Sequence, residues 1–162
     1  MHLHLRAAAE PDIRDDHAWL TAFMGVTWGH HEVECAAGIA HSIEKDHHQL
    51  HEMYAGSQDA DAWLPVFGGR RPADPPAGGL PHPPLVLMDP AEAGRAAAFL
   101  AAVTFDDLWS RAGGRIVRSS GPGRSADPER IRGIFQGHHQ DLRAFYARAA
   151  AAGHAVVKAG WF

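Results

Sequence analysis

A short stretch of the chain gathers imidazole and carboxylate side chains at spacings suited to binding a metal ion. These residues are His41, Glu44, His48 and His51. On a helix that turns about 100° per residue, the four fall within an arc of roughly 80°, although His41 leaves this face if the helix begins at Ser42. Histidine and glutamate are zinc ligands, and two ligands four residues apart on a helix can hold one ion. The spacing therefore predicts a metal site, with zinc as the candidate ion and these four residues as ligands.

The pattern differs from that of the metalloproteases, and a metal-free interpretation stays open beside it. The acidic residue precedes His48 by four positions, whereas the H-E-x-x-H motif places it between two paired histidines. Further ligands are available if the chain folds back, namely His30, His31, Glu32 and Cys35. Without a metal, the same helix is either a solvated face opposite Ile43 and Leu50 or a site for a polar ligand.

Arginine is concentrated in a second stretch, where planar guanidinium groups suit phosphates or carboxylates. The residues are Arg111, Arg115, Arg118, Arg124, Arg130 and Arg132. Residues 119–125 are glycine-containing and resemble a phosphate-binding loop, but they lack the order G-x-x-x-x-G-K-[ST], and Pro122 removes a backbone donor. The stretch predicts either a solvated loop with charge beside its helices or an anion-binding patch.

Nucleophilic catalysis has little support in the sequence. Histidines are available as partners for the single cysteine, Cys35, but no serine lies in a G-x-S-x-G elbow. We expect Cys35 to be a small core residue. On the last helix we expect His138 to lie in the core and His139 to point away from it. The tryptophans are expected to anchor the core, and Trp63 is also a candidate for a binding surface.

Apolar periodicity and capping residues predict the elements that must position these side chains. The predicted strands are residues 3–7, 85–88 and 155–161. The predicted helices begin at residues 11 or 12, 42, 90, 105 and 128. Gly25 is expected to end the first helix and Gly113–Gly114 the fourth, with loop or a short strand following. Residues 26–40 fit either extended or helical structure. This order favours an α+β fold with a small mixed or antiparallel sheet packed against several helices.

Residues 57–84 form the least regular segment. Seven of the eleven prolines lie there, together with two pairs of glycines. Proline lacks a backbone donor and glycine adds chain entropy, so the composition predicts a long loop. Each side of the loop is too short to fold alone. We therefore expect one domain over residues 1–162.

Composition narrows the class of protein. The 162 residues carry a formal net charge of -4, which argues against a nucleic-acid partner because phosphate binding needs a basic surface. No stretch approaches the roughly 18 apolar residues of a membrane span. The N-terminus lacks the apolar run of a signal peptide, and one cysteine cannot form an internal disulfide. We expect a soluble, cytoplasmic, histidine-rich protein without a membrane partner.

Three blocks of sequence carry a family resemblance. They are Glu44–Gly56, with Lys45, Leu50 and His51; Leu87–Glu92; and Leu142–Tyr146 with Gly153 and Val156–Val157. Together they span roughly residues 42 to 160 and resemble the YfbM-like family, a bacterial domain of unknown function. The family usually has a tryptophan where this chain has His47, which removes a large ring from any pocket that it would wall. The resemblance implies a small soluble α+β domain and brings no catalytic residues.

The hypothesis that follows is a non-catalytic binding or protein-interaction module. No nucleophile, acid–base pair and oxyanion site assemble together, so an enzyme is the less favoured class. The predicted ligand-binding residues are His48, His51, Trp63 and Arg143, with Phe67, Arg70 and Arg71 on the same loop as Trp63. The alternative is a divalent-metal-binding protein or a metal-dependent hydrolase that uses the helix of His48 and His51.

Overall fold

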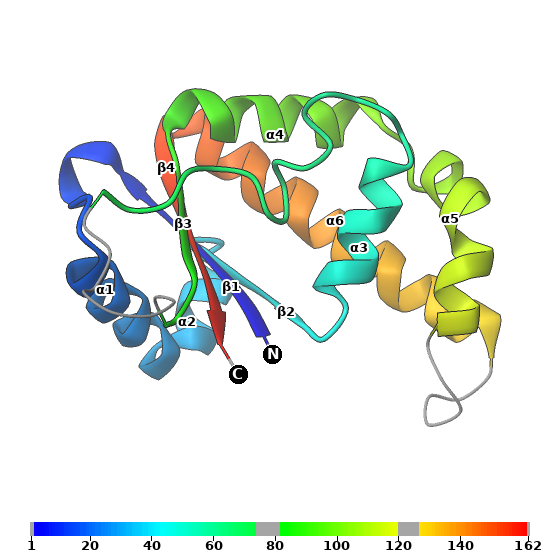
Figure 1. Ribbon diagram of the computed structural model, residues 1–162, viewed down its shortest axis with the longest axis horizontal. Helices are drawn as coiled ribbons and strands as arrows, with labels where there is room; N and C mark the ends of the chain where they lie inside the picture. Colours follow the sequence, from blue (N-terminus) through cyan, green and yellow to red (C-terminus); the bar gives the residue numbers. More distant parts are fainter. Residues whose placement is uncertain (1, 74–81, 120–126, 162) are drawn as a thin grey trace.

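A four-stranded antiparallel sheet forms the centre of the molecule (Figure 1). The computed structural model describes residues 2–73, 82–119 and 127–161, with only the backbone described at Thr27 and Trp28. The sheet order is β2-β1-β4-β3, from β1 (His2–Ala9), β2 (Ala40–Glu44), β3 (Leu85–Met88) and β4 (His154–Trp161). The two long strands pair along their whole length, from His2 opposite Trp161 to Ala9 opposite His154. The first and last segments of the chain therefore lie side by side in the middle of the sheet.

One face of the sheet is covered by the helices that follow β1. After a short 3-10 turn at Glu10–Asp12, α1 (His17–Gly29) packs Leu20 and Met24 against the strands, and α2 (His31–Ala36) follows directly. The strand residues beneath α1 are Leu85, Leu87, Val157 and Ala159. Because strand side chains alternate between faces, Val156 and Lys158 point to the opposite side.

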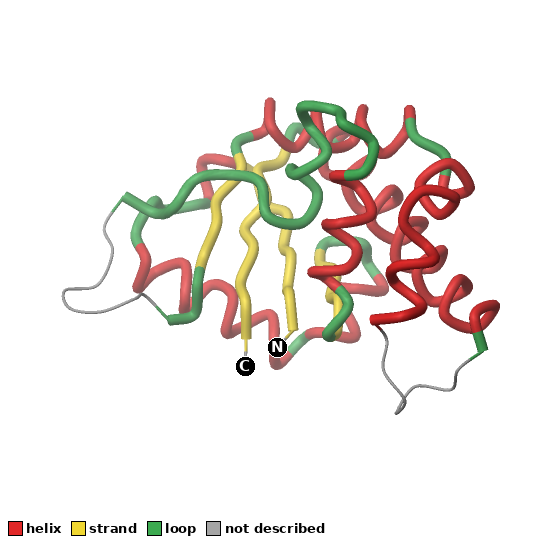
Figure 2. The backbone as a smooth tube through the Cα atoms, turned by 45° about the vertical axis from the view of Figure 1, so that its right-hand side comes forward, coloured by secondary structure: helices red, strands yellow, loops and turns green. Residues whose placement is uncertain are grey.

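The other face carries the larger core, beneath α3 (His47–Ala55), α4 (Pro90–Ala102), α5 (Phe105–Ser119) and α6 (Pro128–Ala151). Leu3, Leu5 and Ile43 of the sheet meet Phe145 and Tyr146 of α6 in this cluster. Figure 2 shows the strands between the two groups of helices. The fold is α+β, as predicted, in a single domain.

Local chemistry explains where the clearest helices begin. Asp89 accepts a hydrogen bond from the Glu92 backbone N–H, and the Glu92 carboxylate accepts one from Asp89, which completes a capping box at the start of α4. Asp127 caps α6 through the Glu129 N–H. Such caps contribute about 1 kcal/mol each. The predictions for these two starts, and for the strands at 3–7, 85–88 and 155–161, are confirmed.

The predicted helix start at Ser42 is wrong. Residues 40–44 are β2, which pairs with β1 from Glu44 opposite His2 to Ala40 opposite Arg6. The helix begins only at His47, after Lys45 turns the chain with a φ of 47°. The apolar spacing of Ile43 with Leu50 fits a helix, but pairing with a strand distant in sequence satisfies the backbone of residues 40–44 instead.

Two helix ends that were predicted from glycine residues are also wrong. Gly25 lies inside α1, and Gly113–Gly114 lie inside α5, which continues through residues 115–119. A glycine in a helix interior costs about 1 kcal/mol relative to alanine. Burial of Leu108, Ala112 and Ile116 along one side of α5 outweighs that cost. Residues 120–125, part of the predicted loop, lie outside the described residues.

The segment after α3 contains turns rather than regular elements over residues 57–73. A single bridge joins Arg70 to Leu87 at the outer edge of β3. Residues 74–81 of the predicted 57–84 loop lie outside the described part. Within the residues that the structure describes, no helix combines the length and apolar character needed to cross a membrane.

Candidate functional site

Three histidines of α3 surround one phenylalanine from the segment that follows. The ring centroids of His51, His48 and His47 lie 4.8, 5.2 and 6.0 Å from that of Phe67. His47 and His48 are themselves 4.5 Å apart. The His47 and His51 rings meet Phe67 edge-on, an arrangement that the ring quadrupoles favour. The histidines in the first turn and a half of α3 thus pack against Phe67 of the segment 57–70.

The three imidazoles differ in their contact with water. His47 is 2% exposed, His51 is half-buried and His48 is exposed. Burial, with the neighbouring His48 as the next cause, lowers the pKa of His47 to about 4. The same two causes lower the pKa of His51. His47 is therefore a neutral core group at neutral pH.

A buried lysine holds the segment in place. Lys158 of β4 is 1% exposed, and its Nζ donates hydrogen bonds to the carbonyl oxygens of Leu64 and, at 2.8 Å, Gly68. The Tyr146 hydroxyl donates to the Pro65 carbonyl at 2.9 Å. Burial drives the pKa of Lys158 well below that of a free amine, and the charge of Glu92 opposes this shift.

Close packing adds to this anchoring at Gly68. A Cβ at this position would lie 2.4 Å from the Leu64 Cα, so the turn depends on glycine. The backbone N–H groups of Phe67 and Gly68 both donate to the Trp63 carbonyl. The segment therefore keeps one defined conformation around Trp63.

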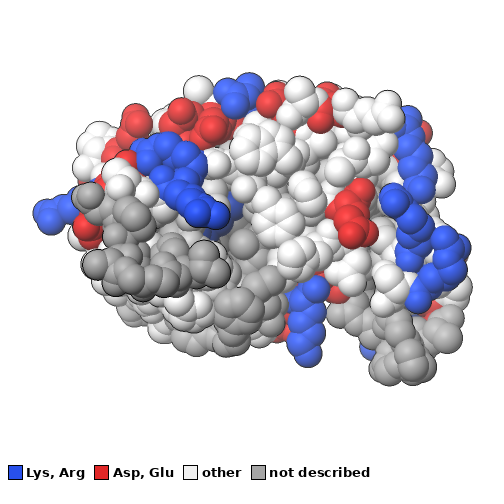
Figure 3. Space-filling model, in the orientation of Figure 1, with Lys and Arg blue, Asp and Glu red and all other residues white. Residues whose placement is uncertain are grey.

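Trp63 lies on the outside of this anchored turn. Its side chain is 45% exposed, one helical turn before Phe67. Large exposed aromatic side chains are enriched where proteins bind partners. We call His48, His51, Trp63 and Phe67 the aromatic face. Figure 3 shows that the surface over α3 and the segment after it is largely uncharged.

The four predicted metal ligands do not share a helix. His41 and Glu44 lie on β2, whereas His48 and His51 lie on α3. His41 packs under α6 with its ring centroid 6.4 Å from that of Phe145, and burial lowers its pKa to about 4. Glu44 is exposed and lies 4.0 Å from His2. Among the described side chains, no three of the His, Cys, Asp and Glu residues are placed to hold a metal ion.

The upstream residues considered as further ligands also lie elsewhere. His31 belongs to α2, on the opposite face of the sheet from α3, and its ring centroid lies 4.7 Å from that of His4, with the two rings tilted by 42°. Its Nδ1 is 3.7 Å from the Cys35 sulfur. Burial, followed by the charge of Glu34, raises the pKa of Cys35, which is half-buried and free. A raised pKa disfavours the thiolate that a nucleophile needs.

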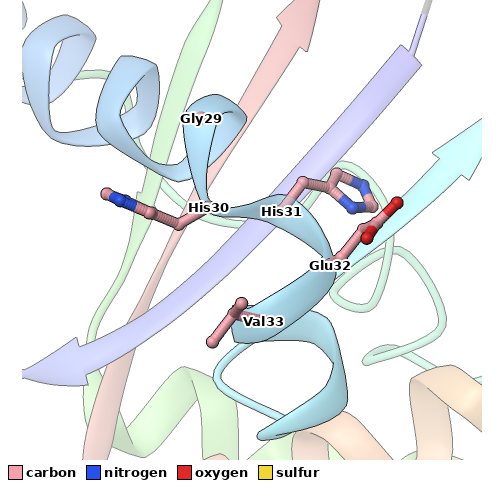
Figure 4. Close-up of a pocket in the computed structure, with 5 residues that line it drawn as sticks. All are labelled: Gly29, His30, His31, Glu32 and Val33. Carbon is pink, nitrogen blue, oxygen red and sulfur yellow. The ribbon is translucent and has the colours of Figure 1, made fainter.

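A pocket of about 450 Å³ opens beside α2. It is lined by Gly29, His30, His31, Glu32 and Val33. In Figure 4, His30 points away from His31 and Glu32, so these side chains do not converge on one ligand. Val33 is 71% exposed at its rim. The pocket is an open surface hollow rather than an assembled site.

Other side chains occupy different places from those predicted. His139 is buried at 3% exposure and shares a hydrogen bond of 3.3 Å with the Tyr54 hydroxyl, whereas His138 is partly exposed and faces Asp46 at 3.5 Å. The predicted roles of these two histidines are thus reversed. Arg143 is exposed on α6, where its charge lowers the pKa of His139 after the larger effect of burial.

Two residues of the site show what the sequence does and does not signal. The hypothesis of a binding loop already includes Phe67, but the sequence does not predict that Phe67 contacts the histidines of α3. The sequence analysis does not predict a role for Lys158. The signal for one is a lone lysine inside the apolar run of residues 155–161, because a buried lysine needs specific hydrogen-bond partners.

The fold and this surface define a class: an α+β domain with a four-stranded antiparallel sheet and an exposed aromatic face beside its third helix. The chain matches the family described as a domain of unknown function (DUF1877) over residues 7–158, and it belongs to that family. The crystal structure of YfbM from Escherichia coli, described as a protein of unknown function, is similar, with a TM-score of 0.59 and 14% identity. The match covers 98% of this chain and 99% of that one, which shows a shared fold. No match is found among curated proteins.

Proposed function

We propose that this protein is a non-catalytic module that binds another protein through its aromatic face. The observation that carries the proposal is Trp63, which stays 45% exposed on a segment that is otherwise anchored to the core. A free loop would lose conformational entropy on binding, but the bonds from Lys158 and Tyr146 order this one beforehand. Such preorganisation favours affinity because less ordering remains to be done in the complex.

The chemistry around Trp63 favours binding over catalysis. Phe67 lies against both His48 and His51, at ring distances of 5.2 and 4.8 Å. The two imidazoles therefore pack on a hydrocarbon ring. Amphipathic rings of this kind provide contact area with few rotatable bonds, as is common at protein interfaces.

A position-specific crosslink tests the proposal. A photoreactive phenylalanine analogue is placed at position 63 or 48, and the protein is irradiated in cells of the source organism. We expect an adduct of one defined mass from both positions. Ile134, which is 37% exposed on α6, provides the control position. Equal adducts from position 134, or none from positions 63 and 48, would contradict the proposal.

A further inference from the structure

The aromatic face is bordered by basic side chains, although the chain as a whole is acidic. Exposed basic side chains border it on several sides: Lys45 before α3, Arg71 at the end of the anchored segment, and Arg111, Arg115 and Arg118 along α5. Figure 3 shows basic side chains at either side of the uncharged area, including a group over α5. The face thus has a basic border in a protein whose net charge is -4.

The α5 arginines belong to the same surface as the anchored segment. Arg111 donates a hydrogen bond of 3.4 Å to the carbonyl of Gly56, where that segment begins. Arg115 and Arg118 follow at four and seven residues, which places all three on one side of the helix. The neighbouring side of α5, with Ala112 and Ile116, is buried in the core.

Acidic side chains neutralise one end of the α5 group. Asp107 precedes Arg111 by one helical turn, and both line a hollow together with Asp59. Glu52 of α3 is also exposed near the border. Asp61 is occupied by Arg95 at 3.1 Å, and Arg70 by Asp15 at 2.6 Å. Because each of these ion pairs is neutral overall, neither changes the net charge of the border. Among the described residues, Arg115 and Arg118 take part in none of these pairs, so the positive charge of the border is concentrated at this end of α5.

We infer that the partner of the aromatic face is an acidic polypeptide segment with an apolar side chain at its centre. The apolar side chain packs on Trp63, and flanking carboxylates approach Arg71 at one end and the α5 arginines at the other. Guanidinium groups bind carboxylates in a planar, two-pronged geometry. This inference rests on the proposed function and adds the chemistry of the partner.

A polypeptide suits the surface better than a nucleic acid or a lipid surface does. Nucleic-acid binding needs a continuous basic track for successive phosphates, with stacking side chains along it. Here the basic residues stand apart on either side of a largely uncharged area, and an acidic group also lies within that area (Figure 3). Anionic vesicles and single-stranded DNA therefore serve as competing outcomes of the test.

Selection of peptides from a random displayed library on the purified full-length protein tests the inference. We expect enriched sequences to carry several Asp or Glu residues around one aromatic or aliphatic residue. The best peptide, synthesised with a fluorescent label, should bind about tenfold more weakly to an Arg115→Glu, Arg118→Glu variant, and more weakly at higher salt. Arg143→Glu, compared with Arg115→Glu alone, provides the matched single charge reversal, and we expect less than about twofold change because Arg143 is an exposed side chain of α6 rather than of α5.

The outcomes separate the partner's chemistry from the proposed function. Peptides that need Trp63 but are not acidic, or that tolerate the double arginine reversal, would overturn the acidic partner and leave the binding face intact. Peptides indifferent to Trp63→Ala would overturn the face itself. The inference would also be overturned if no acidic sequences were enriched and the protein instead bound phosphatidylserine vesicles or single-stranded DNA in a manner that depends on Trp63. The partner would then be a lipid surface or a nucleic acid. Cooperative thermal unfolding of each variant shows that it is folded.

Discussion

At the scale of single residues, the histidines of α3 have separate roles despite their adjacency. His47 is a core residue, whereas His48 remains at the surface. Both His48 and His51 lie against Phe67, and the two other predicted ligands belong to β2. Two ligands alone bind zinc weakly, since protein zinc sites use three or four.

We therefore expect only weak zinc binding by the untagged protein. Added zinc should raise the unfolding temperature little, and a His48→Ala, His51→Ala variant should show the same small change. Mass spectrometry of protein purified without an immobilised-metal column measures the resident metal, and calorimetry measures added zinc. Near-stoichiometric metal that the double variant loses would favour the metal-binding alternative.

At the scale of elements, a buried amine and a buried hydroxyl turn an irregular segment into a fixed surface. Lys158 and Tyr146 come from β4 and α6, and they bond to carbonyls of Leu64, Pro65 and Gly68. A hydrogen bond of this kind contributes about 1 kcal/mol, and a buried carbonyl left without its partner costs about 1–3 kcal/mol. The order of the segment thus depends on two side chains distant in sequence.

We expect Lys158→Met to loosen the segment while the sheet stays folded. Methionine is unbranched like lysine and only one heavy atom shorter, and it removes the cost of burying an amine, but it leaves the Leu64 and Gly68 carbonyls without a donor. Hydrogen exchange at the Leu64, Phe67 and Gly68 amides should rise about tenfold or more, with α6 amides unchanged. Tyr146→Phe, which removes one bond, should give a smaller rise. Unchanged exchange in Lys158→Met would show that packing alone orders the segment.

At the scale of the whole molecule, buried histidines on both sides of the sheet link stability to pH. His4 lies under α2, His41 under α6 and His47 beneath Phe67. Burial is the main cause that lowers the pKa of each to about 4, from an ordinary value of 6.5. Between these values the unfolded chain binds more protons than the folded protein does.

The free energy of unfolding should consequently fall as the pH drops from 6.5 towards 4. One unit of pKa corresponds to about 1.4 kcal/mol, so three such groups predict a loss on the order of several kcal/mol. Urea unfolding at several pH values across this window measures it. His47→Leu should flatten the dependence, because leucine has no proton to gain, whereas His30→Leu at the exposed residue before α2 should not. A wild-type stability that stays constant across the window would contradict the expected linkage.

The sequence alone determined those features whose energetics are local. Caps at Asp89 and Asp127, the apolar run of residues 85–88 and the C-terminal strand depend on residues close along the chain, and each was predictable. The α+β class followed from their order. The prediction of an exposed Trp63 candidate also came from its irregular, proline-rich surroundings.

Only the tertiary structure decided the composition of the candidate site. Residues 40–44 became a strand through pairing with β1, a contact that no local periodicity encodes, and this separated His41 and Glu44 from His48 and His51. The same is true of Lys158, whose acceptors lie about ninety residues away along the chain. Buried polar groups select partners by distance in space, so the chain had to fold before its surface could be assigned.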